Sequence, residues 1–75
     1  MNNIEFGPLL REHREKRGWT QEQLASKAEL STRYVQSLEA QDKLPSLDTV
    51  FKISNALGLS PGELLNPLWL KWEKQ

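Results

Sequence analysis

The sequence predicts an all-α fold, and three observations support that prediction. Apolar residues recur with helical spacing, and no stretch carries the alternating pattern of a strand. Two segments match the capping box, in which Ser or Thr is followed three residues later by Glu or Gln. The breaks between apolar stretches are about 2–6 residues long, which is typical of a compact helical domain.

Three helices are expected in the first half of the chain. The first begins near Gly7-Pro8, since proline fits a first helical turn, and it ends at Gly18. The second begins at the capping box Thr20–Gln23, and the third is capped by Ser31. Their expected core positions are Phe6, Leu10, Leu24, Ala25, Ala28, Val35 and Leu38.

Two more helices are expected in the second half. The fourth begins at Ser46 or Asp48 and ends at Gly58. The fifth opens on the capping box Ser60–Glu63, and Asn66-Pro67 is expected to end it and to restart a short segment. The fourth helix carries the apolar stripe Leu47, Val50, Phe51, Ile53, Ser54 and Leu57.

Composition excludes several classes of function. The 75 residues include 10 basic and 10 acidic side chains, no cysteine and a single histidine. Disulfides and thiolate metal sites are therefore excluded, and one histidine cannot build a zinc site. We expect no metal, no cofactor and no small-molecule ligand, and we expect no enzyme because so small a domain has little room for a catalytic cavity. No apolar run is long enough to cross a membrane, which favours a cytoplasmic protein.

The second and third helices form the informative pair. The turn between them is too short for antiparallel packing, and Ala25 and Ala28 are small enough for the third helix to cross closely at a steep angle. That is the geometry of a helix-turn-helix. Val35 and Leu38 then face the core, and the opposite face fits the DNA major groove. That outward face carries Ser31, Thr32, Arg33, Gln36 and Ser37.

A series of short motifs occurs along most of the chain in a fixed order. They are Phe6-Gly7 with Arg11 and Arg14, Gly18-x-Thr20-Gln21-x-x-Leu24-Ala25, Leu30-Ser31, Tyr34-Val35-x-x-Leu38-Glu39, Pro45-Ser46-Leu47, Ile53-x-x-Ala56-Leu57-Gly58-Leu59 and Leu64-Leu65. This set resembles the Cro/C1-type (XRE-type) helix-turn-helix family over residues 6–65. The resemblance implies a compact five-helix, lambda-repressor-like domain over residues 1–65, followed by a C-terminal tail over residues 66–75. It also implies a sequence-specific DNA-binding transcriptional regulator. Small family members include phage repressors, restriction-modification controller proteins and antitoxins, which the motifs do not distinguish.

The resemblance further implies which residues contact double-stranded DNA. Thr32, Arg33 and Ser37 match positions that reach base edges, and Gln36 lies beside them. Arginine reads guanine through O6 and N7, and threonine offers a methyl group to thymine. The recognition helix, about residues 31–40, is then expected to lie in the major groove.

Other matched positions have supporting roles in the family. Gln21 matches a glutamine that anchors a phosphate and braces the recognition helix, at a helix N-terminus that already favours anions. Tyr34 matches a position that contacts the sugar-phosphate backbone, and Lys43 lies in a phosphate-contacting loop. Arg14 and Glu39 match an internal salt bridge, which we interpret as structural.

The sequence departs from the family pattern at two positions where glycine is common. Glu29 occupies the turn before the third helix, where it is expected to adopt a positive φ at a cost of roughly 1 kcal/mol. Gln41 stands two residues after Glu39. The loop that follows has Lys43 as its one basic residue, which weakens the expected phosphate anchoring.

Three tryptophans and a histidine complete the set of candidates. Trp19 is expected in the core and His13 at its half-buried edge. Trp69 and Trp72, with Leu68, either pack back over the N-terminal residues and the fifth helix or form a self-complementary patch for a homodimer.

The neutral charge favours one alternative to DNA recognition. In that alternative the helix-turn-helix scaffold is retained, but the tryptophan-bearing tail engages another protein and DNA binding is weak or absent. A nucleic-acid interface would lose affinity steeply with salt, whereas an apolar protein interface would not.

Overall fold

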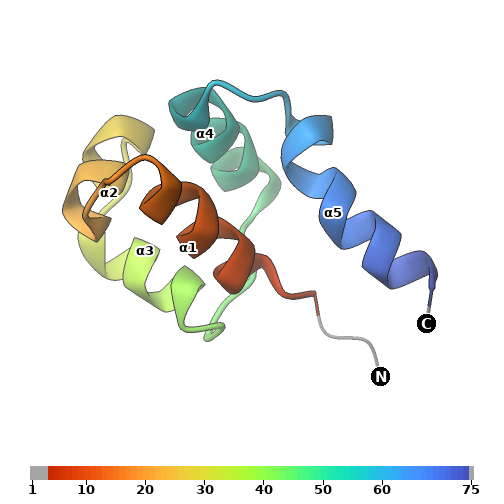
Figure 1. Ribbon diagram of the computed structural model, residues 1–75. Helices are drawn as coiled ribbons and strands as arrows, with labels where there is room; N and C mark the ends of the chain where they lie inside the picture. The colour runs from red at the N-terminus through yellow and green to blue at the C-terminus, as the bar shows by residue number, and fades with distance from the viewer. Residues whose placement is uncertain (1–3, 75) are drawn as a thin grey trace.

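The computed structural model describes residues 4–74, and in this range the five expected helices are present (Figure 1). The helices are α1 (Phe6–Lys16), α2 (Gln21–Ala28), α3 (Thr32–Glu39), α4 (Leu47–Leu57) and α5 (Pro61–Glu73). The C-terminal half of α5 extends past the other four helices (Figure 1). No helix in residues 4–74 combines the length and apolar character needed to cross a membrane.

Side-chain caps explain where four of the helices begin. Thr20, Ser31, Ser46 and Ser60 each accept a hydrogen bond from the backbone N–H three residues ahead. Both expected capping boxes form, because Gln23 and Glu63 each accept a bond from the backbone N–H of their cap residue. Each such cap contributes about 1 kcal/mol to stability. In α1, by contrast, the side chain of the cap residue Glu5 accepts no hydrogen bond from the first turn of the helix.

The ends of α1, α2, α3 and α4 share one backbone motif. Each helix is followed by a residue at positive φ, namely Gly18 at 69°, Glu29 at 57°, Gln41 at 65° and Gly58 at 73°. The N–H of that residue donates to the carbonyl three positions earlier, and the next N–H donates to the carbonyl five positions earlier. These paired bonds are those of the Schellman motif, which normally uses glycine. The positive φ expected at Glu29 is confirmed.

The core draws on all five helices. Phe6, Leu10, Leu24, Ala25, Ala28, Val35, Leu38, Val50, Ile53, Leu57 and Leu64 are buried. The stripe expected on α4 is only partly correct, because Leu47 is 68% exposed and Phe51 is 53% exposed. One arc of α4 faces the core, and Phe51 lies about 100° further round the helix than Val50. Phe51 therefore lies beyond the buried arc, and Leu47 is the first residue of α4 and lies at the exposed end of the helix.

The expected break at Asn66-Pro67 is wrong, because α5 runs without interruption from Pro61 to Glu73 and contains Pro67. Pro67 is exposed, and its missing N–H deprives only the carbonyl of Glu63, on an equally exposed turn, of a helical partner. Buried Leu64 and partly buried Leu68 pack on either side of this point and hold the helix together. The helix therefore crosses the boundary expected between residues 65 and 66.

Candidate nucleic-acid interface

The second and third helices pack as the sequence suggests. Ala25 and Ala28 are each 2% exposed, so α3 crosses α2 where neither side chain keeps the backbones apart. The turn between the helices consists of Glu29, Leu30 and Ser31. Ser31 accepts a bond of 3.1 Å from the N–H of Tyr34, which fixes the first turn of α3.

One face of α3 is buried and the other is available to a ligand. Val35 and Leu38 are fully buried. Arg33 and Gln36 are exposed on the opposite face, and neither forms a side-chain hydrogen bond or ion pair within residues 4–74. Thr32 and Ser37 are partly exposed beside them. This surface therefore offers a guanidinium, an amide and two hydroxyls with most of their hydrogen-bonding capacity unused.

The C-terminal end of α3 is fastened to α1 by an ion pair. Arg14 donates to Glu39 through Nε at 2.7 Å and through Nη2 at 3.0 Å, and its Nη1 donates to the carbonyl of Trp19 at 2.9 Å. The two charged side chains are 12% and 5% exposed. The hydrogen bonds to Glu39 raise the pKa of Arg14 above its ordinary value. This arrangement is the internal salt bridge that the resemblance implies.

Gln21 and Tyr34 make internal contacts as well. Gln21 Nε2 donates to Oε1 of Glu39 at 3.1 Å, so the first residue of α2 braces the last turn of α3. The Tyr34 hydroxyl lies 3.1 Å from Oγ1 of Thr49, and that oxygen also accepts a bond of 3.0 Å from Ser46. The Tyr34–Thr49 contact ties α3 to the start of α4. Sequence reasoning missed it, since no local pattern relates positions 34 and 49.

The loop between α3 and α4 carries Lys43. Residues 41–44 are all exposed, and Lys43 forms no ion pair within residues 4–74. It lies at the same end of α3 as Glu39, whose charge is already neutralised by Arg14. Lys43 and Arg33 are therefore the available cations on α3 and the loop that follows it.

The three tryptophans lie at the edge of the core or outside it. Trp19 is only partly buried, and its ring has Lys27 Nζ at 4.9 Å and Arg17 Cζ at 5.7 Å from the centroid. Trp69 and Trp72 remain 55% and 43% exposed. The expectation of a buried Trp19 is thus met only in part.

An open apolar groove runs along the exposed part of α5. It has a volume of about 360 Å³ and is lined by Ile4, Leu65, Leu68, Trp69 and Trp72. The tail thus lies beside the N-terminal segment, as the first of the two expected arrangements suggests. Even so, the rings of both tryptophans stay accessible, so this packing leaves the second arrangement open.

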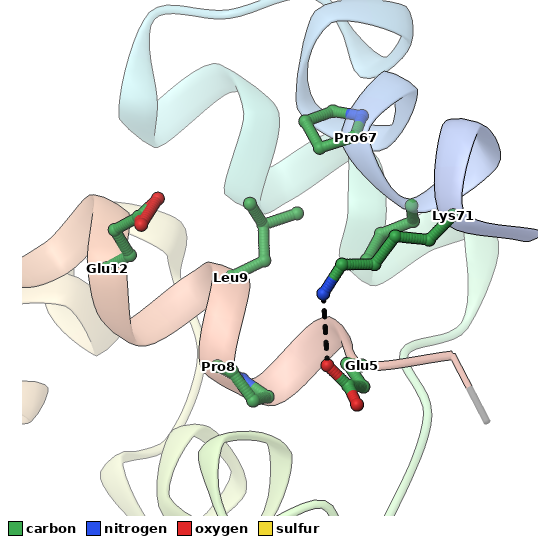
Figure 2. Close-up of a pocket in the computed structure, with 7 residues that line it drawn as sticks. Glu5, Pro8, Leu9, Glu12, Pro67 and Lys71 are labelled. Atoms are coloured by element: carbon green, nitrogen blue, oxygen red, sulfur yellow. Dashed lines mark hydrogen bonds and ion pairs between the residues drawn. The ribbon is translucent and has the colours of Figure 1, made fainter.

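A second hollow, of about 270 Å³, lies between α1 and α5 (Figure 2). Lys71 crosses its mouth to reach Glu5 at 3.3 Å, and both side chains are largely exposed. Exposed pairs of this kind contribute about 0–1 kcal/mol. Within residues 4–74 no group of His, Cys, Asp or Glu side chains could hold a metal ion. The hollow therefore shows how α5 is attached to α1, and it carries no recognisable chemistry.

The fold and the exposed face of α3 define a helix-turn-helix protein. The chain belongs to the helix-turn-helix family, whose model matches residues 10–64. It is 40% identical over 68 residues to the control protein C.BamHI of Bacillus amyloliquefaciens, covering 87% of this chain and 84% of that protein. The predicted family resemblance is therefore confirmed.

Two solved structures extend the comparison. The restriction-modification controller protein C.AhdI from Aeromonas hydrophila is 38% identical with a TM-score of 0.76, over 81% of this chain and 92% of that chain. The biofilm master regulator SinR, solved in complex with DNA, is 30% identical with a TM-score of 0.74, over 80% of this chain and 97% of that chain. The five-helix arrangement is therefore that of known regulators.

Proposed function

We propose that this protein, a DNA-binding transcriptional regulator of the helix-turn-helix family, lays α3 in the major groove of duplex DNA. The observation that carries the proposal is the exposed, unengaged face of α3 around Arg33 and Gln36. The similarity to the control protein C.BamHI and to the biofilm regulator SinR supports the proposal, and SinR was solved in complex with DNA. The protein is a regulator and not an enzyme, and we infer that it acts in the cytoplasm.

Base discrimination falls to four side chains of α3. Arg33 is suited to guanine O6 and N7, and Gln36 to adenine N6 and N7. Thr32 and Ser37 flank them with hydroxyl groups that reach other base edges. The four lie within two turns, so together they read only a few adjacent base pairs.

Three other residues position the helix on the sugar-phosphate backbone. Lys43 offers a free cation, and Gln21 stands at the N-terminus of α2, where backbone N–H groups favour a phosphate. Tyr34 lies in the first turn of α3, beside the start of α4. Because the chain has no net charge, these local contacts replace the broad basic surface of many DNA-binding proteins.

Selection of binding sites from random duplexes tests this proposal. Replacing Arg33 by Ala should cost about 1–3 kcal/mol at one base pair and relax the preference there. Replacing Lys43 by Ala should weaken all sequences alike and reduce the salt slope by about 0.9. Lys52→Ala, on α4, is the matched control and should change neither. If Arg33→Ala kept the wild-type ratio of specific to random binding, Arg33 would not read bases.

We also propose that two copies bind together as a homodimer through Leu68, Trp69 and Trp72. Support comes from the open apolar groove on α5 and from the preference of protein interfaces for aromatic residues. A two-fold dimer would address two half-sites about one helical turn apart, doubling the contacts of a chain with few cations.

Sedimentation equilibrium tests the dimer. Trp72→Glu should shift the protein to monomers and weaken binding to a two-half-site duplex. Phe51→Glu, which changes an exposed aromatic residue on α4, is the matched control and should leave the mass unchanged. The reverse result would move the interface to α4.

The exposed tryptophans and the neutral charge favour a second candidate, a protein-interaction module on the helix-turn-helix scaffold with weak or no DNA binding. The two functions differ in their response to salt. DNA binding through several phosphates weakens steeply between low and moderate salt, and an apolar protein interface does not.

A further inference from the structure

The residue that follows α3 adopts an unfavourable backbone conformation. Gln41 has a φ of 65°, a region that disfavours every residue with a Cβ and is normally left to glycine. It is also exposed, so apolar burial does not hold it there. The contacts of its side chain supply the compensation.

Those contacts reach the start of α1. Gln41 Oε1 accepts a hydrogen bond of 2.6 Å from the N–H of Gly7, and its Nε2 donates to the carbonyl of Ile4 at 3.3 Å. Glu5, the cap residue of α1, offers no side-chain bond to the first turn. Gln41 therefore caps α1 from a turn 34 residues away in sequence.

The backbone of α1 approaches the end of α3 closely enough to require glycine. A Cβ on Gly7 would lie 2.5 Å from the carbonyl oxygen of Leu38 and 2.7 Å from that of Glu39. It would also lie 2.8 Å from Gln41 Oε1. The first turn of α1 and the last turn of α3 thus meet backbone to backbone, and the Gln41 amide closes the junction.

The same amide is the side-chain anchor of the loop before α4. Within residues 4–74, Gln41 is the one member of residues 40–45 whose side chain forms a hydrogen bond or ion pair. Asp42 is held through its backbone N–H, which donates to the carbonyl of Ser37 at 3.0 Å. Lys43 follows directly and carries its cation on this anchored turn.

We propose that Gln41 is a positioning residue for DNA binding, which acts by fixing the loop that presents Lys43. The inference rests on the proposed function, since Lys43 matters only if a phosphate lies beside it. Gln41 itself does not contact DNA. Its contribution is to order the loop before binding, so that less conformational freedom is lost when the contact forms.

A double-mutant cycle with Lys43 tests the proposal. Gln41→Gly removes the amide and the backbone strain together, and Gln41→Asn keeps an amide that is one methylene too short to reach Gly7. Each should weaken specific DNA binding about three- to tenfold, the cost of ordering one released segment. Neither should weaken binding further when Lys43 is already Ala. Glu29→Gly, the equivalent change at the other end of α3, is the matched control and should leave affinity unchanged.

NMR of the free protein provides a readout without DNA. In Gln41→Gly the Gly7 amide should lose its protection from exchange, and the order parameter of Lys43 should fall from about 0.85 towards 0.6. Equal losses of affinity with Lys43 present and absent would overturn the proposal, because Gln41 would then act elsewhere. Unchanged affinity of Gln41→Gly would also overturn it. A wild-type protein that bound no duplex would instead defeat the proposed function.

Discussion

The two turns that flank α3 have the same backbone geometry but different side-chain support. Glu29 and Gln41 both adopt positive φ and both sit in the paired hydrogen bonds that close a helix. Gln41 makes two side-chain bonds to α1, whereas Glu29 is exposed and forms no side-chain bond within residues 4–74. Similar conformational strain, roughly 1–2 kcal/mol in each turn, is thus compensated in one and not in the other.

The contrast extends to the whole of α3. Its C-terminal end is bonded to α1 and α2 through Glu39, and its N-terminal end is held by the Ser31 cap and by the contact of Tyr34 with Thr49 of α4. In α1 and α4 the corresponding left-handed positions are filled by Gly18 and Gly58, which need no such support. The proposed recognition helix is therefore fastened by a buried ion pair at its C-terminal end and by hydroxyl contacts at its N-terminal end, and the proposed base-reading residues lie between Ser31 and Glu39.

Removing the Arg14–Glu39 ion pair should have the largest effect on the unfolding free energy. Arg14→Met leaves the buried Glu39 carboxylate without its main partner, which should cost about 3–5 kcal/mol of unfolding free energy. Arg11→Met, which breaks an exposed pair with Glu15, is the matched control and should cost about 0.5 kcal/mol or less. Urea denaturation measures both. A cost below about 1 kcal/mol for Arg14→Met would mean that the Arg14–Glu39 pair does not anchor the C-terminal end of α3.

Glycine substitutions at positions 29 and 41 should have smaller and unequal effects on the unfolding free energy. Glu29→Gly should raise the unfolding free energy by about 1 kcal/mol, since it removes strain and breaks no side-chain bond. Gln41→Gly should leave it nearly unchanged, because relief of strain is offset by two lost hydrogen bonds of about 1 kcal/mol or less each. Thermal denaturation of both variants gives the difference directly. Equal gains would show that the Gln41 bonds contribute nothing to stability.

Acidification should have the smallest effect on the unfolding free energy. It should not change the difference between the turns at Glu29 and Gln41. Burial lowers the pKa of His13 below 6.5, and the nearby charges of Arg17 and Lys16 lower it further. The unfolded chain therefore binds the proton more readily, so stability present above pH 6.5 is lost as the pH falls through the folded-state pKa. His13→Gln should flatten the stability profile between about pH 7 and 5. The Glu29 and Gln41 variants should keep their difference over that range, and a difference that closed with pH would implicate a titrating group.

Local chemistry made most of the fold predictable. The capping residues Thr20, Ser31, Ser46 and Ser60 act on amides only three positions away, so their roles are visible in the sequence. The wrong expectation at Pro67 arose because a proline was weighed without the packing on either side of it. Leu47 and Phe51 belong to the helical stripe of α4 but are exposed, because a stripe does not reveal how wide the buried arc is.

Helical spacing alone predicted the candidate site only where one helix decides the outcome, whereas the Arg14–Glu39 pair between α1 and α3 was expected from the family resemblance. Burial of Val35 and Leu38 turns Arg33 and Gln36 outward, and spacing alone shows this. The contact between Gln41 and Gly7 depends on two segments that meet only in the folded chain. No sequence pattern predicts such a contact. The one indication is that Gln41 stands where the family commonly has glycine.

Pro67 removes one backbone hydrogen bond from α5. Because Pro67 has no N–H, the carbonyl of Glu63 lacks its helical hydrogen bond at the point where α5 leaves the bundle. The two tryptophans lie beyond that position, and the proposed DNA-binding helices α2 and α3 lie before it in the chain. Substitutions in the outer turns of α5 should therefore change the proposed dimer contact and leave the proposed DNA-binding face of α3 unaltered.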